Sequence, residues 1–288
     1  MRFITSDDYA IIGSPMPLTP VPMNVFIFGL VAIALYLAAA VKSSEIARAA
    51  ASSHASRPGT ALVAFAAVAA HAAALYPMMV TGAGINLGIF SAASLVAWII
   101  ATIAIVATLR APVASLVVVI LPFTAVIVGM SLMFTDQHLL SHLPAGLALH
   151  IGLSLIAYSL FAIATLQALY LMFAARRLKA HAPVLRFLPP LATMEQLMFQ
   201  LTAIAFVLLS LGLAVGMHYI HDMRAQHLTH KIFFSVLAWL TIAVLLVGRY
   251  HWHWRGRRAV KFLIAGFVML ALGFFGSKIV LELVLNRP

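Results

Sequence analysis

Long hydrophobic stretches alternate with short polar segments along most of this 288-residue chain. A stretch of about 20 hydrophobic residues is long enough for a helix to cross the hydrocarbon core of a membrane. The predicted fold is therefore all-α, a polytopic membrane bundle in which residues 22–288 form a single transmembrane domain. The eight predicted spans lie at about residues 22–41, 59–81, 88–108, 112–134, 147–175, 197–217, 231–249 and 261–283.

The composition excludes a soluble protein. Hydrophobic residues make up 64% of the chain and charged residues 9%, whereas a soluble domain carries about 25% charged residues. Membrane anchoring explains the net charge of +11, because the basic segment WRGRR (residues 254–258) directly follows a predicted span and can meet anionic lipid headgroups. No nucleic-acid partner is expected. The chain has no cysteine, which excludes disulfides, thiolate metal sites and thioether attachment of heme.

Basic residues are distributed unequally between the two sides of the predicted bundle. By the positive-inside rule, this asymmetry places both termini outside and the basic loops in the cytoplasm. Residues 1–21 lack the basic segment and adjoining apolar core of a signal peptide. They are predicted to be a short periplasmic tail, or an over-extended reading frame with its true start at Met23. Thirteen of the 18 basic residues lie on the predicted cytoplasmic side: Lys42, Arg48, Arg57, Arg110, Arg176, Arg177, Lys179, Arg186, Arg249, Arg255, Arg257, Arg258 and Lys261.

The twelve histidines suggest where the chemistry takes place. Four of them, His54, His181, His251 and His253, fall in predicted cytoplasmic loops, where solvated side chains are the simplest interpretation. The other eight lie within spans or on the outer side: His71, His138, His142, His150, His218, His221, His227 and His230.

Counting along the helices gives the depth of these histidines. At 1.5 Å per residue from the cytoplasmic ends, His71 lies about 21 Å up, near the middle of the membrane. His150 and His221 both reach about 39 Å, while His218 and His230 come to about 34 and 28 Å. His71 is therefore predicted to be a lone mid-membrane site, separate from an outer group around His150.

His150 begins a narrow polar stripe. Ser154, Tyr158 and Thr165 follow it at nearly helical spacing, and such a stripe is expected to face the interior of a bundle. A histidine at this position either ligates a metal or forms a hydrogen bond to a neighbouring helix. For His71, the surrounding alanines are compatible with close helix packing and with space for a flat macrocycle.

Imidazole is a good ligand for iron, copper, zinc and nickel. The acidic residues, Glu195 among them, are predicted outside the spans, apart from Glu282 with Lys278 as its partner. The lack of acids inside the membrane counts against a proton-coupled pump. A bis-histidine heme fits better, with Lys278, Lys231 and Arg224 as candidates for its propionates. A histidine-lined metal-ion transporter and a b-type electron carrier that reacts with quinone are the alternatives.

Several segments resemble the membrane cytochrome c assembly family, the heme-handling proteins of the CcsA and HemX type. The resemblance runs from about Met23 to the C-terminus, and within the family it is strongest to the small eight-span YpjD-like branch. The matching segments are HAAALY (71–76), GINLGIFSAASLVAWII (84–100), LALHIGLSLIAYSLFAIATLQALYL (147–171), FSVLAWLTIAVLLVGRYHWHWRGRRA (234–259) and FFGSKIVLELVL (274–285).

The resemblance implies that the protein binds or moves heme at the bacterial inner membrane for cytochrome c maturation. It implies a non-covalent heme b, with maturation proteins or an apocytochrome as partners. His150 matches the family's external heme histidine. The segment between the sixth and seventh spans lacks the tryptophan-rich motif of heme-attaching synthases, which argues against synthase activity. The predicted heme-binding residues, in the membrane or at its periplasmic face, are His71, His142, His150, His218, His221, His230 and Lys278.

Overall fold

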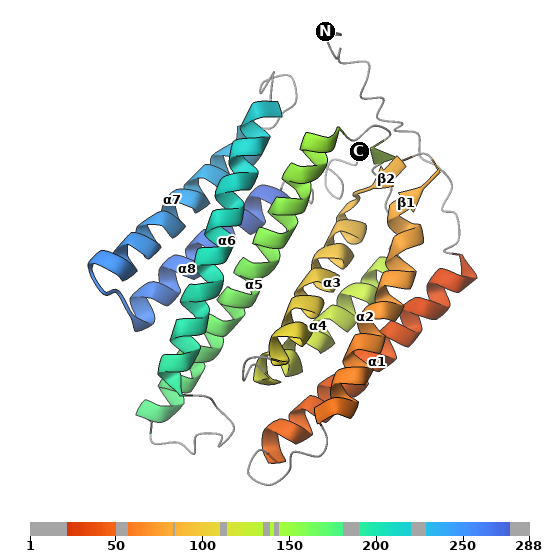
Figure 1. The fold of residues 1–288 in the computed structure, drawn as a ribbon, viewed down its shortest axis with the longest axis horizontal. Coiled ribbons are helices and arrows are strands. Elements are labelled where there is room, and N and C mark those ends of the chain that lie inside the picture. The colour runs from red at the N-terminus through yellow and green to blue at the C-terminus, as the bar shows by residue number, and fades with distance from the viewer. Residues whose placement is uncertain are drawn as a thin grey trace. The chain divides into compact units, whose positions relative to one another are not determined.

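The computed structural model describes residues 22–49, 57–82, 84–109, 114–134, 139–140, 144–180, 190–219 and 229–276. Figure 1 shows the helices in chain order, from α1 in red to α8 in blue. The helices are α1 (Met23–Ala49), α2 (Arg57–Met79), α3 (Ile89–Thr108), α4 (Ala114–Met133), α5 (Ala145–Lys179), α6 (Leu191–Tyr219), α7 (Thr229–His251) and α8 (Gly256–Ala271), which continues as a π-helical turn over Leu272–Gly276.

The helices confirm the prediction of an all-α polytopic membrane bundle. Within the described residues, α1 to α7 are each long and apolar enough to cross a membrane. The eighth predicted span, 261–283, is represented by α8 and the π-helical turn, which together end at Gly276. Its remaining residues lie outside the described part of the chain.

The sixth helix begins earlier than the hydrophobic pattern predicts. Its first turn follows Pro190, whose carbonyl accepts the N–H of Met194 at 3.1 Å, because proline can precede a helix although it cannot continue one. Glu195, which was predicted to lie outside the sixth span, therefore belongs to α6 and to its candidate membrane span. This carboxylate is buried in the second turn of α6.

The chain divides into two compact units. The first unit holds α1 to α4, and each helix contacts the next while α4 returns to contact α1. The second unit holds α5 to α8 with the same cyclic order of neighbours. In a ring of four helices, a polar side chain that points inward can hydrogen-bond a group on a neighbouring helix or, for a hydroxyl, a carbonyl of its own helix.

A small antiparallel sheet, which the sequence did not predict, lies at one end of the first unit. It consists of β1 (Val80–Thr81), β2 (Gly84–Asn86) and β3 (Leu139–Leu140). Val80 pairs with Ile85, and Ile85 also pairs with Leu140 on its other side. The sheet therefore ties the α2–α3 connection to the segment that follows α4.

Candidate functional site

His150 lies in the second turn of α5 and faces α6. Its Nδ1 is 2.7 Å from the carbonyl oxygen of Gly212. A carbonyl oxygen can only accept a hydrogen bond, so Nδ1 carries the proton and donates it. In the neutral imidazole, the lone pair then sits on Nε2, which is the form that a metal ion requires. Metal-binding histidines commonly hold their second nitrogen in this way, against a backbone carbonyl.

Two glycines of α6 let this helix lie close to α5, one against the imidazole ring and one against Ser154. A Cβ added at Gly216 would lie 2.7 Å from both Nδ1 and Cε1 of His150, and one added at Gly212 would lie 3.4 Å from Oγ of Ser154. The two glycines are four residues apart, the spacing that lets membrane helices approach closely. We call Gly212 and Gly216 the glycine notch. The glycine notch was not predicted from the sequence, although the segment GLAVG (212–216) carries the spacing.

The polar stripe that follows His150 faces the interior of the second unit. The hydroxyl of Tyr158 donates to the carbonyl of Leu270 on α8 at 3.1 Å. Thr165 is buried, and its Oγ1 has no hydrogen-bond partner within the described residues. The helix that carries His150 is thus fixed against α6 near its N-terminal end and against α8 further along.

His71 lies on α2 inside the first unit, with 1% of its surface exposed. Its Nδ1 is 3.2 Å from the hydroxyl of Tyr36 on α1, and its Nε2 is 3.0 Å from Oγ of Ser94 on α3. The Ser94 hydroxyl in turn lies 3.4 Å from Oγ of Ser131 on α4. We call Tyr36, His71, Ser94 and Ser131 the His71 network, and it connects all four helices of the unit.

Both nitrogens of His71 are therefore engaged with hydroxyl groups. Ligation of an iron atom would require one of these two bonds to break. The ring of Tyr36 also meets the imidazole edge-on, with centroids 5.8 Å apart. This arrangement favours a structural role for His71 in joining the helices, and its assignment as a heme ligand stays a prediction.

The structure describes only some of the other predicted ligands. His218 lies near the end of α6 and is exposed. At about 100° per residue it sits roughly opposite Gly216 on the helix, so it faces away from α5. His142, His221, Arg224 and Lys278 lie outside the described residues, as does the side chain of His230. The pairing of His150 with His221 accordingly stays a prediction.

The described residues contain no group of three or more His, Asp or Glu side chains that could hold a metal ion. The arrangement at His150 instead offers one imidazole nitrogen, oriented by a backbone carbonyl, beside a glycine-lined helix surface. Such a nitrogen could ligate a metal ion, including the iron of a heme.

The chain is similar to proteins of one known family. The model of the family described as "Cytochrome C assembly protein" matches residues 60–285. The inner membrane protein YpjD of Escherichia coli (strain K12) is 36% identical over 204 residues, which cover 70% of this chain and 77% of YpjD. An uncharacterized 28.8 kDa protein of Azospirillum brasilense is 31% identical over 142 residues, 48% of this chain and 52% of that protein. No solved structure matches.

Proposed function

Because the chain belongs to the cytochrome c assembly protein family, we propose that it binds heme non-covalently through His150 and handles heme for cytochrome c assembly. The observation that supports this most directly is the bond of 2.7 Å between Nδ1 of His150 and the Gly212 carbonyl. It fixes the imidazole in the tautomer whose Nε2 is free of a proton and can ligate iron.

The residues fit heme on chemical grounds. His150 would hold the iron through Nε2, and we propose His221 as the second ligand, with His218, His142 and His230 as the alternatives. Lys278 would pair with a propionate. When bound, heme b would supply an iron porphyrin that is available for transfer or for electron exchange. The Gly212 carbonyl keeps the proton of His150 on Nδ1, and the glycine notch sets the position of the ring.

We further propose that the His150 end of the second unit faces the periplasm and that the protein resides in the bacterial inner membrane. The clustering of basic residues at the opposite ends of α5 and α8 supports this orientation. A heme held at the outer face would be within reach of an apocytochrome or of other maturation proteins. The absence of the tryptophan-rich segment favours heme handling over heme attachment.

The proposal predicts that the protein purified from heme-replete cells is red. We expect a Soret band, sharp low-spin bands after reduction with dithionite, and complete extraction of the heme by acidified acetone, since the chain has no cysteine for covalent attachment. A colourless protein that also fails to bind added hemin would contradict the proposal. In that case, altered metal content of expressing cells would indicate a transporter, whereas rapid reduction of bound heme by quinol would indicate an electron carrier.

The glycine notch supplies a second test. Gly216→Ala would place a methyl group 2.7 Å from the His150 ring, so the ring must move away from the Gly212 carbonyl. We expect hemin affinity to fall about 10-fold, in line with the loss of other groups that orient a metal-binding histidine. Hemin titration followed at the Soret band measures this change.

Gly152→Ala on α5 is the matched control, because a Cβ there meets no atom within 4 Å. Both changes raise helix propensity by about 1 kcal/mol, so this effect cancels between them. Equal affinities in the two variants would show that heme binding does not depend on the position of His150 against the notch.

A further inference from the structure

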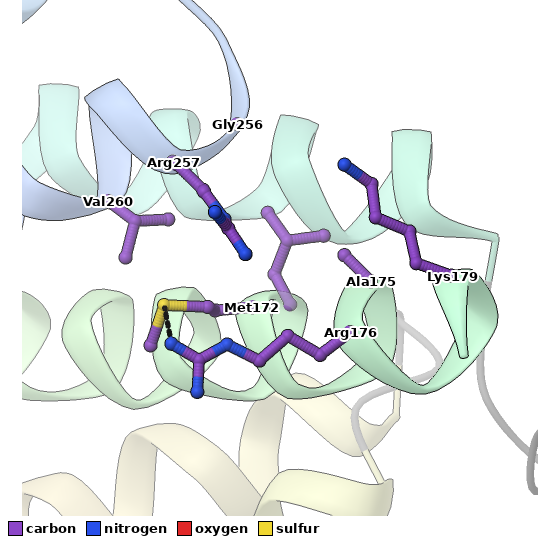
Figure 2. A pocket seen from close by; sticks show the side chains of 8 residues that line it. Met172, Ala175, Arg176, Lys179, Gly256, Arg257 and Val260 are labelled. Atoms are coloured by element: carbon purple, nitrogen blue, oxygen red, sulfur yellow. Dashed lines mark hydrogen bonds between the residues drawn. The ribbon is translucent and has the colours of Figure 1, made fainter. Parts of the chain in front are cut away.

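A cavity of about 210 Å³ lies in the second unit, between the last turns of α5 and the first turns of α8. Its floor is apolar, with Leu171 and Val260 buried and Met172 half-buried. Its rim carries three cationic side chains, and no acidic residue is among the described residues that line it. Figure 2 shows Arg257 pointing from α8 across the cavity toward α5, where Arg176 and Lys179 stand.

Two neighbouring basic residues lie over aromatic rings. Arg258 stacks on the ring of Trp254 at 4.1 Å, and Arg177 lies over Phe173 at 5.2 Å. These contacts separate Arg258 and Arg177, which use aromatic surface, from the three cations that line the cavity. The distinction makes the cavity a defined site within a generally basic surface.

The wall formed by α8 is held in place by Glu195 of α6. Its Oε2 accepts hydrogen bonds from Arg255 at 2.8 and 2.9 Å, and its Oε1 accepts the N–H of Gly256 at 3.2 Å. The hydrogen bond to Glu195 raises the pKa of Arg255 above its usual value. Because Gly256 begins α8 and lines the cavity, this carboxylate fixes the helix end from which Arg257 projects.

We propose that this cavity binds the phosphate of an anionic phospholipid at Arg176, Lys179 and Arg257, with the start of an acyl chain over Leu171, Met172 and Val260. Three cations around one space repel one another unless an anion lies between them, and guanidinium groups match phosphate oxygens in charge and geometry. The apolar floor suits a lipid better than a free anion. Basic pockets between membrane helices at the cytoplasmic side are a known form of headgroup site. The inference goes beyond heme binding and does not depend on it.

The experiment compares one triple and one double charge variant of the full-length protein. Arg176→Gln, Lys179→Gln and Arg257→Gln together remove the cavity cations, while Arg177→Gln with Arg258→Gln removes neighbouring cations that do not line it. Each protein, purified in detergent, is titrated with phosphatidylglycerol or phosphatidylcholine, and bound lipid is counted by native mass spectrometry. Since each basic residue near a membrane surface adds about 1 kcal/mol, we expect the cavity variant to bind phosphatidylglycerol about 100-fold more weakly than the wild type.

The proposal requires that the control variant retain most phosphatidylglycerol binding and that the wild type prefer phosphatidylglycerol to phosphatidylcholine. Equal losses in the two variants would overturn it, because attraction would then come from the general basic surface. No preference between the lipids would also overturn it. If inorganic phosphate at millimolar concentration displaces all bound phosphatidylglycerol, the ligand of the cavity is a free anion and the lipid proposal is overturned. Unchanged melting temperatures in detergent would show that weaker binding does not come from unfolding.

Discussion

His150→Ala is expected to remove the low-spin heme spectrum and to lower hemin affinity by about 100-fold. Loss of a group that only orients a metal ligand lowers metal affinity about 10- to 100-fold. Loss of the ligand itself should therefore reach the upper end of this range. His221→Ala should produce a similar spectrum, high-spin or devoid of heme, if it supplies the second axial nitrogen. The double variant should bind hemin only slightly more weakly than the weaker of the two single variants, because both changes remove ligands from the same iron. Heme content and spin state are read from the optical spectrum of each purified protein.

His251→Ala is the control for these variants, since His251 is exposed at the opposite end of the second unit. It should leave the spectrum unchanged. Independent, additive losses at His150 and His221 would mean that the two histidines serve different sites. An unchanged spectrum in His150→Ala would reduce His150 to a packing residue that donates to Gly212, and family membership alone would then support heme binding.

His71→Ala is expected to lower the free energy of unfolding by about 3 kcal/mol. The change leaves the buried hydroxyls of Tyr36 and Ser94 without their partner, each bond in a membrane protein being worth about 0.6–1.7 kcal/mol. It also opens a space inside the ring of α1 to α4, which adds a cost for lost packing. For a chain of this size, the melting temperature in detergent should fall by about 6–12 °C.

Two further variants separate the structural role of His71 from ligation. Tyr36→Phe removes one bond of the His71 network and should cost about 1 kcal/mol. His71→Gln keeps polar atoms in the space and should recover part of the stability. Loss of heme from both His71 variants at an unchanged melting temperature would instead establish His71 as a ligand.

The spans were predictable because the length of each hydrophobic stretch identifies them. The structure differs from the prediction at short strands and at one helix end, where contacts between particular residues decide the conformation. The strands β1 to β3 have only two or three residues each, too few for any alternation of polar and apolar positions to appear. Helix α6 begins at Leu191, before the predicted span, and its buried Glu195 pairs with Arg255, which lies 60 positions away in the sequence.

The candidate site was predictable in part. His150 stands out in the sequence because it interrupts an apolar stretch. The sequence contains GLAVG as well, but only the packing of α5 on α6 shows that the notch faces this particular histidine. For His71, the sequence identified the residue without its partners, because Tyr36, Ser94 and Ser131 come from three other helices.

The hydrogen bonds of the His71 network can hold their protons in either order. The Ser131 hydroxyl lies within hydrogen-bond distance of two acceptors, Oγ of Ser94 at 3.4 Å and the carbonyl of Val128 at 2.9 Å. When Ser131 donates to Ser94, the Ser94 hydroxyl can donate to Nε2 of His71, and Nδ1 can donate to Tyr36. When Ser131 donates to Val128 instead, all three of these bonds can reverse, because hydroxyl groups both donate and accept and imidazole has two tautomers. The network therefore joins the same four helices in both orders, and the join does not depend on which order is populated.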